Sequence, residues 1–325
     1  MALSDLAVYS EYAYSTMTEV LQQQIELFNT ATENCLMLRP AAHQGDFSDT
    51  AFFAKIAGGT VRRRNAYGSG SIASKTVEHL VDTSVKVAAG TPEFTFEPSN
   101  FKWIQQNPEQ AGAAFGMQLA KDTMADMLNT GLGATVAAFA QESEIFLNVT
   151  ANSDTAKRTP SWNNLNAAAF KFGDKSSEIR CWIMHSTPMG VLYDKNITND
   201  NRLFTYGSLN VVRDPFGRLL VMTDSPELVI AGSTPQYNLL GLRQGAIYLG
   251  QNNDFTAAET DVTGNENLSK TYQAEWSFQL GIQGFSWDKA TGGKSPTNAA
   301  LMSSGNWDRY ATSHKDLGGV LLRTL

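Results

Sequence analysis

Residues 107–141 read NPEQAGAAFGMQLAKDTMADMLNTGLGATVAAFAQ, and this stretch decides the fold. Asn107 can cap a helix, Pro108 fits the first helical position, and Glu109 complements the positive end of the helix dipole. Nearly every later residue favours a helix. The stretch therefore predicts one rod of roughly 50 Å, at ~1.5 Å rise per residue, which is far above the usual helix length.

Residues 271–283 read TYQAEWSFQLGIQ and alternate between apolar and polar side chains without a break. A period of two predicts a strand with one buried face. Ordinary strands have about 5–6 residues, so this one is about twice the usual length and would reach about 40 Å at ~3.3 Å per residue. A long rod beside a long one-sided strand predicts an elongated plate, a shape that suits tiling.

Two segments before the long helix differ from each other. In residues 1–56 the spacing of Met17, Leu21 and Ile25 predicts one or two helices, in an arm that packs on neighbouring elements. Residues 57–100 contain glycine-rich breaks and a strand-like run from 76 to 87 with partial alternation. Their composition predicts a two-stranded ribbon with both faces largely wet. An isolated hairpin is marginal, so support must come from outside the chain's own core.

Residues 161–250 alternate between short helix signals and short strand signals, which predicts a compact α+β unit. The expected helices cover 165–172 and 188–195, and the expected strands cover 179–184, 209–212 and 219–222.

Composition limits the classes of function. The formal net charge of the 325 residues is −7, and an acidic surface repels phosphate, so a dedicated nucleic-acid binder is disfavoured. Cys35 and Cys181 lie in apolar settings, which favours free buried thiols and a reducing cytoplasm. The N-terminus lacks a signal peptide pattern, and no stretch reaches the ~18–20 apolar residues of a membrane span.

Glycine motifs do not predict a nucleotide site. Gly292-Gly293-Lys294-Ser295 resembles the end of a phosphate-binding loop, but Asp288 stands where the pattern needs glycine, and Pro296 follows at once. A surface turn is favoured. Gly68-Ser69-Gly70 lacks the third glycine of a dinucleotide fingerprint, so we expect a flexible loop tip there. The sequence predicts no cofactor.

Candidate catalytic and metal-binding residues are equally weak. The four histidines show no metal-ligand spacing. His185-Ser186 follows a predicted strand, but adjacent residues rarely form a nucleophile–base pair, so a polar cap at the strand end is favoured. The acidic residues in 251–267 fit no calcium loop, which favours a solvated loop at an intersubunit rim. We therefore expect no catalytic residue and no metal site.

Arg62, Arg63 and Arg64 form the only concentrated basic patch. Three arginines can bind phosphate, or they can pair with carboxylates on a neighbouring subunit. Because the protein is acidic elsewhere, intersubunit pairing is favoured for these three residues.

The order of these elements resembles the HK97-like major capsid proteins of tailed bacteriophages. Local strings support the resemblance: residues 167–174 (AAAFKFGD) with 183–186 (IMHS), and 306–309 (NWDR) with 313–320 (SHKDLGGV). It implies an HK97-like α+β fold with four parts: an N-terminal arm (1–56), an E-loop (57–104), a P-domain with the spine helix (105–160 and 269–300) and an A-domain (161–268 and 301–325).

The resemblance also implies a function. The subunit would form hexamers and pentamers, and these would close an icosahedral shell around double-stranded DNA in the host bacterial cytoplasm. The E-loop would lie across the adjacent subunit, with separate scaffolding and portal proteins as partners. One alternative is an encapsulin-type nanocompartment shell, which shares the fold but packages protein. A different class is an α+β enzyme that uses the His185 region.

Overall fold

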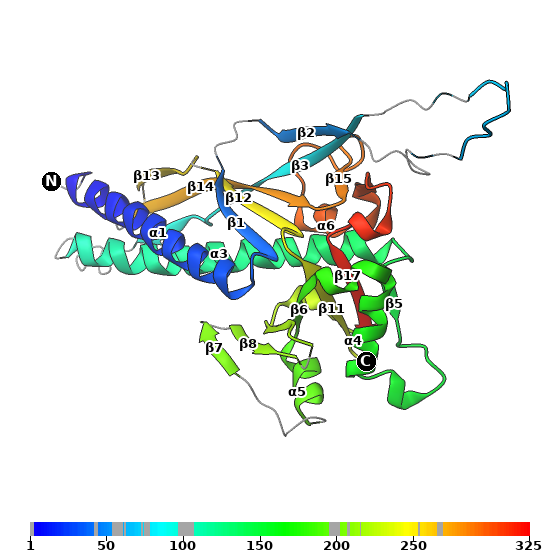
Figure 1. Cartoon of the computed structure of the whole chain (residues 1–325). Helices are drawn as coiled ribbons and strands as arrows, with labels where there is room; N and C mark the ends of the chain where they lie inside the picture. Colours follow the sequence, from blue (N-terminus) through cyan, green and yellow to red (C-terminus); the bar gives the residue numbers. More distant parts are fainter. Residues whose placement is uncertain are drawn as a thin grey trace.

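The computed structural model describes most of the chain, and Figure 1 shows a long helix with sheets on either side. The described residues are 3–41, 45–53, 61, 63–72, 74, 79–96, 107–194, 202–206, 209–214, 216–252, 254–264 and 269–325. Their longer helices are α1 (Leu3–Ala31), α3 (Pro108–Ala140), α4 (Trp162–Ala169) and α5 (Ser186–Asp194).

The long rod predicted from residues 107–141 is α3, which runs unbroken from Pro108 to Ala140. The cap prediction was wrong in its detail, because the Asn107 side chain makes no capping hydrogen bond. With φ −143° and ψ 66°, Asn107 leaves its backbone carbonyl to accept from the Ala111 N–H at 3.1 Å. Proline at the first turn still provides the helical φ angle.

The N-terminal helix α1 lies along α3, and the two helices run parallel (Figure 1). Tyr9 faces Gly112, and Ala13 faces Gly116 one turn further along both helices. A Cβ atom at Gly116 would lie only 2.4 Å from the Ala13 carbonyl oxygen, so this close approach of two backbones requires glycine. The expectation that the N-terminal segment packs on neighbouring elements is confirmed for α1.

The first sheet, here called the long-strand sheet, is organised around β14 (Ser269–Ile282), the strand that the alternation predicts. Its other strands are β1 (Leu36–Ala41), β2 (Phe47–Phe53), β3 (His79–Gly90), β4 (Phe94–Phe96), β12 (Ile247–Asn252), β13 (Thr256–Val262), β15 (Phe285–Trp287) and β16 (Trp307–Arg309). Tyr272 and Phe278 are buried as expected. Ser277 and Gln279, on the opposite face, are buried as well, so the strand is not one-sided at its centre. The side chains of Asn252 and Asp254 both bond to Ser277 on this face.

The ribbon differs from the expectation in its partner strand. β3 pairs with β2, at residues 47–53, and among the described residues of 57–100 it has no second strand as its partner. The inner half of β3 also joins β14, from Val85 to Gly90, and Val85 and Val87 are buried. The prediction of two largely wet faces was therefore wrong for this half of the strand.

The second sheet, here called the compact sheet, has the strand order β5-β17-β11-β6-β9-β8-β7, and β10 pairs with β11. These strands are β5 (Phe146–Asn148), β6 (Ile179–Met184), β7 (Arg202–Tyr206), β8 (Leu209–Arg213), β9 (Leu219–Met222), β10 (Val229–Ile230), β11 (Gln236–Arg243) and β17 (Gly319–Thr324). The strands predicted at 179–184, 209–212 and 219–222 are β6, β8 and β9. The helices predicted at 165–172 and 188–195 correspond to α4 and α5.

Sheet membership changes between β11 and β12. Both β12 and β13 pair with β14, although they lie inside the range 161–268 that the resemblance assigns to the A-domain. The division of the chain into four parts stays a prediction. The expected solvated loop at 251–267 was wrong, because residues 256–262 form β13, paired with β14 from Glu275 to Ser269.

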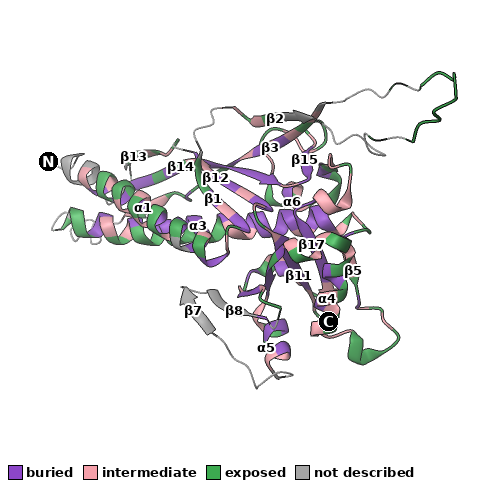
Figure 2. Ribbon diagram, viewed as in Figure 1, coloured by how far each residue is buried: buried purple, intermediate pink, exposed green. Residues whose placement is uncertain are grey.

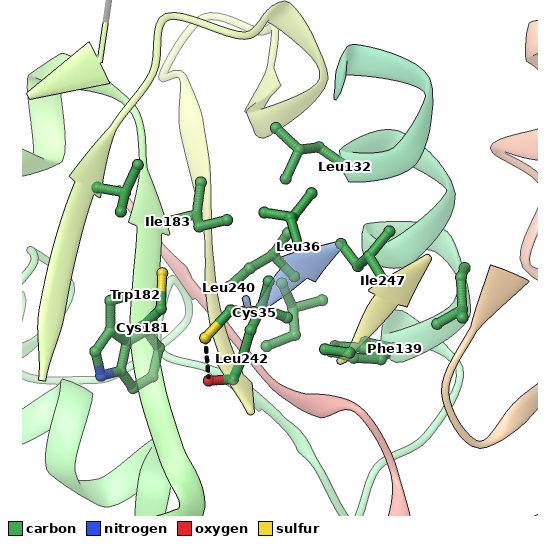
Figure 3. Packing of buried hydrophobic residues seen from close by; sticks show 14 of the residues in the cluster. Cys35, Leu36, Leu132, Phe139, Cys181, Trp182, Ile183, Leu240, Leu242 and Ile247 are labelled. Atoms are coloured by element: carbon green, nitrogen blue, oxygen red, sulfur yellow. Dashed lines mark hydrogen bonds between the residues drawn. The ribbon is translucent and has the colours of Figure 1, made fainter. Parts of the chain in front are cut away.

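One hydrophobic core joins the two sheets through α3, and it forms the continuous buried zone at the centre of Figure 2. Figure 3 shows this junction, where Leu132 and Phe139 of α3 meet Ile247 of β12 and the strands of the compact sheet. Cys35 and Cys181 are both free and buried here, as predicted, and the Cys35 thiol lies 3.7 Å from the Leu242 carbonyl oxygen.

Candidate subunit-contact surfaces

The limb, defined here as described residues 61 and 63–72, extends far from the body of the molecule (Figure 1). Its apolar side chains are open to solvent: Tyr67 is 99% exposed, Val61 87% and Ile72 65%. Folded proteins usually bury such side chains, and a cluster of exposed ones marks a contact site. The limb is therefore the first candidate surface.

Two of the three predicted contact residues lie on the limb. Arg63 and Arg64 are exposed, while Arg62 lies outside the described residues. Next to them the Asn65 side chain accepts a hydrogen bond from the Tyr67 N–H at 3.0 Å, and the Gly68 N–H donates to the Asn65 carbonyl at 3.3 Å. A local turn thus shapes the limb just after the arginines.

The ribbon base, defined here as residues 45–50 and 79–84, is fastened to the region after β14. Asp49 bonds to Lys289 with 2.6 Å between Oδ2 and Nζ, and it accepts a hydrogen bond from the Thr83 hydroxyl at 2.8 Å. The Thr83 N–H donates to the Ser286 hydroxyl at 3.1 Å. These contacts join β2 and β3 to β15 and the turn that follows it.

Asp82 and Tyr310 form a second contact at the ribbon base. The Tyr310 hydroxyl accepts from the Gly284 N–H at 3.1 Å and shares a hydrogen bond with the Asp82 carboxyl group. Burial raises the pKa of Asp82 to about 6, against the opposing effect of the Tyr310 hydrogen bond, and the nearby Asp49 charge adds to the rise. Burial likewise raises the pKa of Tyr310 to about 12, with the Asp82 charge as the next cause.

A groove of about 520 Å³ lies on the polar face of the long-strand sheet. We call it the sheet groove; its lining residues are Lys86, Ala88, Ala89, Gly90, Thr91, Asp254, Thr256, Gln273, Glu275, Trp276 and Ser277. Lys86 and Asp254 form an ion pair with 3.1 Å between Nζ and Oδ2, and the Ser277 N–H donates to Asp254 at 2.9 Å. Gln273 and Glu275 are exposed at its surface.

Burial acts to raise the pKa of Asp254, but the hydrogen bonds from Ser277 and Lys86 outweigh it, and the pKa is lowered. Asp254 is therefore charged and already paired at neutral pH. Glu275 leaves a further carboxylate on an exposed part of the groove.

The His185 region has the geometry of a helix cap. His185 follows β6, and its Nδ1 lies 3.3 Å from both the Ser186 hydroxyl and the Thr187 N–H at the start of α5. Its Nε2 lies 3.5 Å from Asp224, which is largely exposed and accepts from the Ser186 N–H at 3.3 Å. The hydrogen bonds to first-turn N–H groups favour the predicted polar cap over a nucleophile–base pair.

The glycine motif at 292–295 wraps around a tryptophan. A Cβ at Gly292 would lie 2.1 Å from the Trp287 ring, Gly293 has φ +77°, and the Trp287 indole N–H donates to the Gly293 carbonyl at 3.0 Å. These contacts give the motif a packing role as a turn. Within the described ranges, no group of three or more His, Cys, Asp or Glu side chains is placed to hold a metal ion. The helices described are too short or too polar to cross a membrane.

Sequence reasoning found the limb arginines but missed the ribbon base. Asp49 and Lys289 stand 240 residues apart, and no motif or period links them. The sequence held one hint: Asp82 is a charged residue within a run that is otherwise typical of a strand, and such a charge needs a partner when it is buried.

Comparisons with known proteins agree with the resemblance in the sequence. The family model "Gp13-like: Major capsid protein 13-like" matches residues 5–321. No curated protein matches this chain.

Solved structures share the fold at low sequence identity. The capsid of cyanophage Pam1 matches with a TM-score of 0.50 at 10% identity, over 87% of this chain and 85% of that one. The SrpI encapsulin of Synechococcus elongatus PCC 7942 also gives 0.50 at 10% identity, over 88% and 83%. The capsid of Ralstonia phage GP4 gives 0.48 at 11% identity, over 89% and 87%.

The matched family covers nearly the whole chain, and the Pam1 capsid shares its fold. The chain therefore belongs to the Gp13-like family of major capsid proteins, has an HK97-like fold, and is a shell-forming structural protein.

Proposed function

We propose that this subunit assembles into hexamers and pentamers that close an icosahedral shell around a double-stranded DNA genome. The observation that carries the proposal is the limb, which exposes Val61, Tyr67 and Ile72 on a chain whose two sheets already share one packed core. These three apolar side chains lie along one extended segment and gain little burial in their own chain, which supports a contact with another molecule.

Negative-stain microscopy of the purified, full-length chain tests this proposal. We expect closed particles tens of nanometres across, since a repeated contact between identical surfaces closes only at a set number of copies. Discrete small oligomers under all assembly conditions would overturn the shell and would favour the alternative of a small α+β enzyme. The subunit itself has a structural role in this proposal and catalyses no reaction.

The partners proposed are further copies of the chain, a separate scaffolding protein, a portal protein and enclosed DNA, with assembly in the host bacterial cytoplasm. The encapsulin-type nanocompartment is the second candidate, and the match to the SrpI encapsulin favours it. Genes for a portal and a terminase beside the gene for this chain support the phage shell. A neighbouring gene for a cargo enzyme supports the nanocompartment.

Arg62, Arg63 and Arg64 are proposed to pair with carboxylates of a neighbouring copy. Arg63 and Arg64 are exposed on the limb, and the sheet groove supplies the exposed carboxylate of Glu275, beside an Asp254 that is already paired with Lys86. Arginine binds carboxylates through two parallel hydrogen bonds, which gives a directed contact. The sheet groove of the adjacent subunit is therefore the proposed receptor for the limb.

Cysteine cross-linking tests the receptor, because both native thiols are buried and do not compete. Under mild oxidation the double variant Tyr67→Cys with Gln273→Cys is expected to give a ladder of linked chains on a denaturing gel. The matched control is Tyr67→Cys with Asn163→Cys, which places the second thiol at an exposed position on α4. Equal ladders from both variants would contradict the assignment.

Charge reversal tests the arginines themselves. Changing Arg62, Arg63 and Arg64 to Glu should abolish shell formation, and reversal of Glu275 to Arg in the same chain should restore part of it. Reversed variants that assemble normally and only loosen packaged DNA would instead assign the arginines to phosphate.

A further inference from the structure

The two ends of the compact sheet carry opposite charges at their surface. β6 and β9 run parallel, and four successive residues of each are paired, so both strands begin at one end of the sheet and finish at the other. Arg180 is exposed just before the paired residues of β6, and Asp224 is largely exposed just after β9. We call these the arginine end and the aspartate end. At ~3.3 Å per residue, the two ends lie roughly 13 Å or more apart.

A tightly bonded turn between β8 and β9 presents an aromatic ring at the arginine end. The buried Asp214 carboxylate accepts from the N–H groups of Phe216 and Arg218, both at 2.8 Å, and from the Arg218 Nε at 2.7 Å. Arg218 also donates to the Asn166 side chain of α4 at 2.7 Å. The turn is therefore held from two sides, although the Phe216 ring is 63% exposed. An aromatic side chain in a rigid, exposed position is suited to anchor a partner.

A second exposed ring and a cation adjoin this turn. Phe170, which ends α4, is 68% exposed and follows Asn166 by one helical turn, so both lie on the side of α4 that faces Arg218. Arg180 directly precedes the β6 residue that pairs with Leu219, so its backbone lies beside that of Arg218. The arginine end is therefore an aromatic and cationic surface.

The aspartate end combines a carboxylate with apolar side chains. Asp224 lies 3.5 Å from the Nε2 atom of His185, and the His185 ring lies 5.7 Å from the ring of Tyr237. Tyr237 pairs with Val229 across the β10–β11 ladder, and the next residue, Ile230, is exposed. A series of neighbouring side chains thus connects the exposed carboxylate with an exposed aliphatic residue. The aspartate end is therefore an apolar and anionic surface.

A ring of identical subunits requires two different surfaces on every copy. Each subunit in a ring meets one neighbour with one surface and the other neighbour with a second surface, whereas a surface that pairs with itself stops at a dimer. The arginine end and the aspartate end differ in the way that such a contact needs, because their charges are opposite and both expose apolar side chains.

We propose that the compact sheets of neighbouring copies meet head to tail in each hexamer and pentamer, with the arginine end of one copy against the aspartate end of the next. In this contact Arg180 pairs with Asp224 through parallel hydrogen bonds, and the Phe216 ring covers Ile230. The contact deepens the proposed function and rests on it, since it serves to close a ring of copies. It uses neither the limb nor the sheet groove.

Cysteine cross-linking of the purified, full-length chain tests this contact. The double variant Phe216→Cys with Ile230→Cys places one thiol at each end of the sheet. Under mild oxidation it should give a ladder on a denaturing gel that stops at five and six linked chains, because a head-to-tail contact closes on itself. The matched control is Phe216→Cys with Lys121→Cys, at an exposed position on α3, and it should give mainly single chains. A ladder that stops at two chains, continues past six or equals that of the control would overturn the contact.

Charge reversal gives a second readout. Arg180→Glu should reduce the yield of closed particles about tenfold, and Asp224→Arg in the same chain should restore part of the yield. Lys121→Glu is the matched reversal on α3 and should assemble as wild type does. Dissociated subunits of all variants should keep the circular dichroism spectrum of wild type, which separates a lost contact from a lost fold. An Arg180→Glu chain that folds and assembles normally would contradict the proposed pairing.

Failure of this contact and failure of the proposed function give different results. A wild-type chain that forms no closed particles would overturn the proposed function and the ring contact with it. Wild-type particles that form normally, together with equal ladders from the cysteine pair and its control, would overturn the ring contact alone.

Discussion

Two aromatic residues mark the contrast between the body and the limb. Trp182 is fully buried in the compact sheet, where the ring leaves no space for a Cβ on Gly241, 2.8 Å away. Tyr67 on the limb is 99% exposed. One chain thus contains a region whose aromatic side chain is packed inside the fold and a region whose aromatic side chain is open to solvent. The difference teaches that the side chains that stabilise the fold and the side chains open to a partner lie in separate parts of this subunit.

The largest expected effect on stability is at Trp182, the buried residue of this pair. Trp182→Ala should lower the free energy of unfolding by about 3–5 kcal/mol, because it opens a cavity in the shared core. Urea denaturation of dissociated, full-length subunits, followed by circular dichroism, measures the loss. Phe216→Ala is the matched control, since Arg218 lies over both rings, at 6.0 Å and 5.2 Å from their centroids, but Phe216 is largely exposed. Equal losses in the two variants would contradict the contrast.

The next effect concerns the α1–α3 pair. Gly116→Ala should lower the free energy of unfolding by about 1–3 kcal/mol, because the new methyl group meets the Ala13 carbonyl and overpacks the crossing. The control is Gly190→Ala in α5, where a Cβ has nothing within 4 Å. Since alanine is the better helix former, this control should gain up to about 1 kcal/mol. Thermal unfolding of both variants checks the opposite signs, and a stabilised Gly116→Ala chain would show that the helices separate easily.

A smaller, pH-dependent effect is expected in the sheet groove. Because the pKa of Asp254 is lowered in the folded protein, its charged form adds to the free energy of unfolding above the ordinary pKa of an aspartate. This stabilisation is lost as the pH falls through the lowered pKa. Asp254→Asn should therefore be less stable than wild type at pH 7, by about 0.5–1 kcal/mol, and should converge with it in strong acid. Denaturation at a series of pH values tests this. Gln273→Ala, at an exposed, uncharged position on the same groove, is the control, and its difference from wild type should not vary with pH.

The smallest effect on the isolated subunit is expected on the limb. Tyr67→Ala should change the free energy of unfolding by no more than about 0.5 kcal/mol, because the Tyr67 side chain is almost fully exposed and so buries almost no surface against its own chain. The same variant should reduce the yield of closed particles, counted by microscopy. Ser69→Ala, two residues away, is the control and should assemble normally. A subunit clearly destabilised by Tyr67→Ala would show that the limb packs on its own body.

Sequence periodicity predicted the long elements, because helix and strand periods are local properties of the chain. The helix at 108–140, the strand at 269–282 and the strand at 179–184 all appear where the pattern places them. The side-chain cap at Asn107 did not form, since such a bond depends on backbone angles, here φ −143° and ψ 66°, that residue type alone does not determine.

Contacts between distant segments could not be predicted in this way. The pairing of β2 with β3 and the ion pair of Asp49 with Lys289 depend on how the sheet is assembled, and no local residue pattern records that arrangement. The same holds for Asp82 and Tyr310. Of the candidate contact surfaces, the sequence therefore predicted the arginines, which form a run, and missed the contacts of the ribbon base.

The exposed arginines of the limb also make the subunit cleavable. Trypsin cuts after arginine, and an extended, solvent-exposed segment is the preferred place for such cleavage. Arg63 and Arg64 lie in such a segment, on a chain whose core is closed to proteases. In the proposed shell a neighbour covers the limb and removes this access, so a brief digestion would separate free subunits, cut at the limb, from assembled ones.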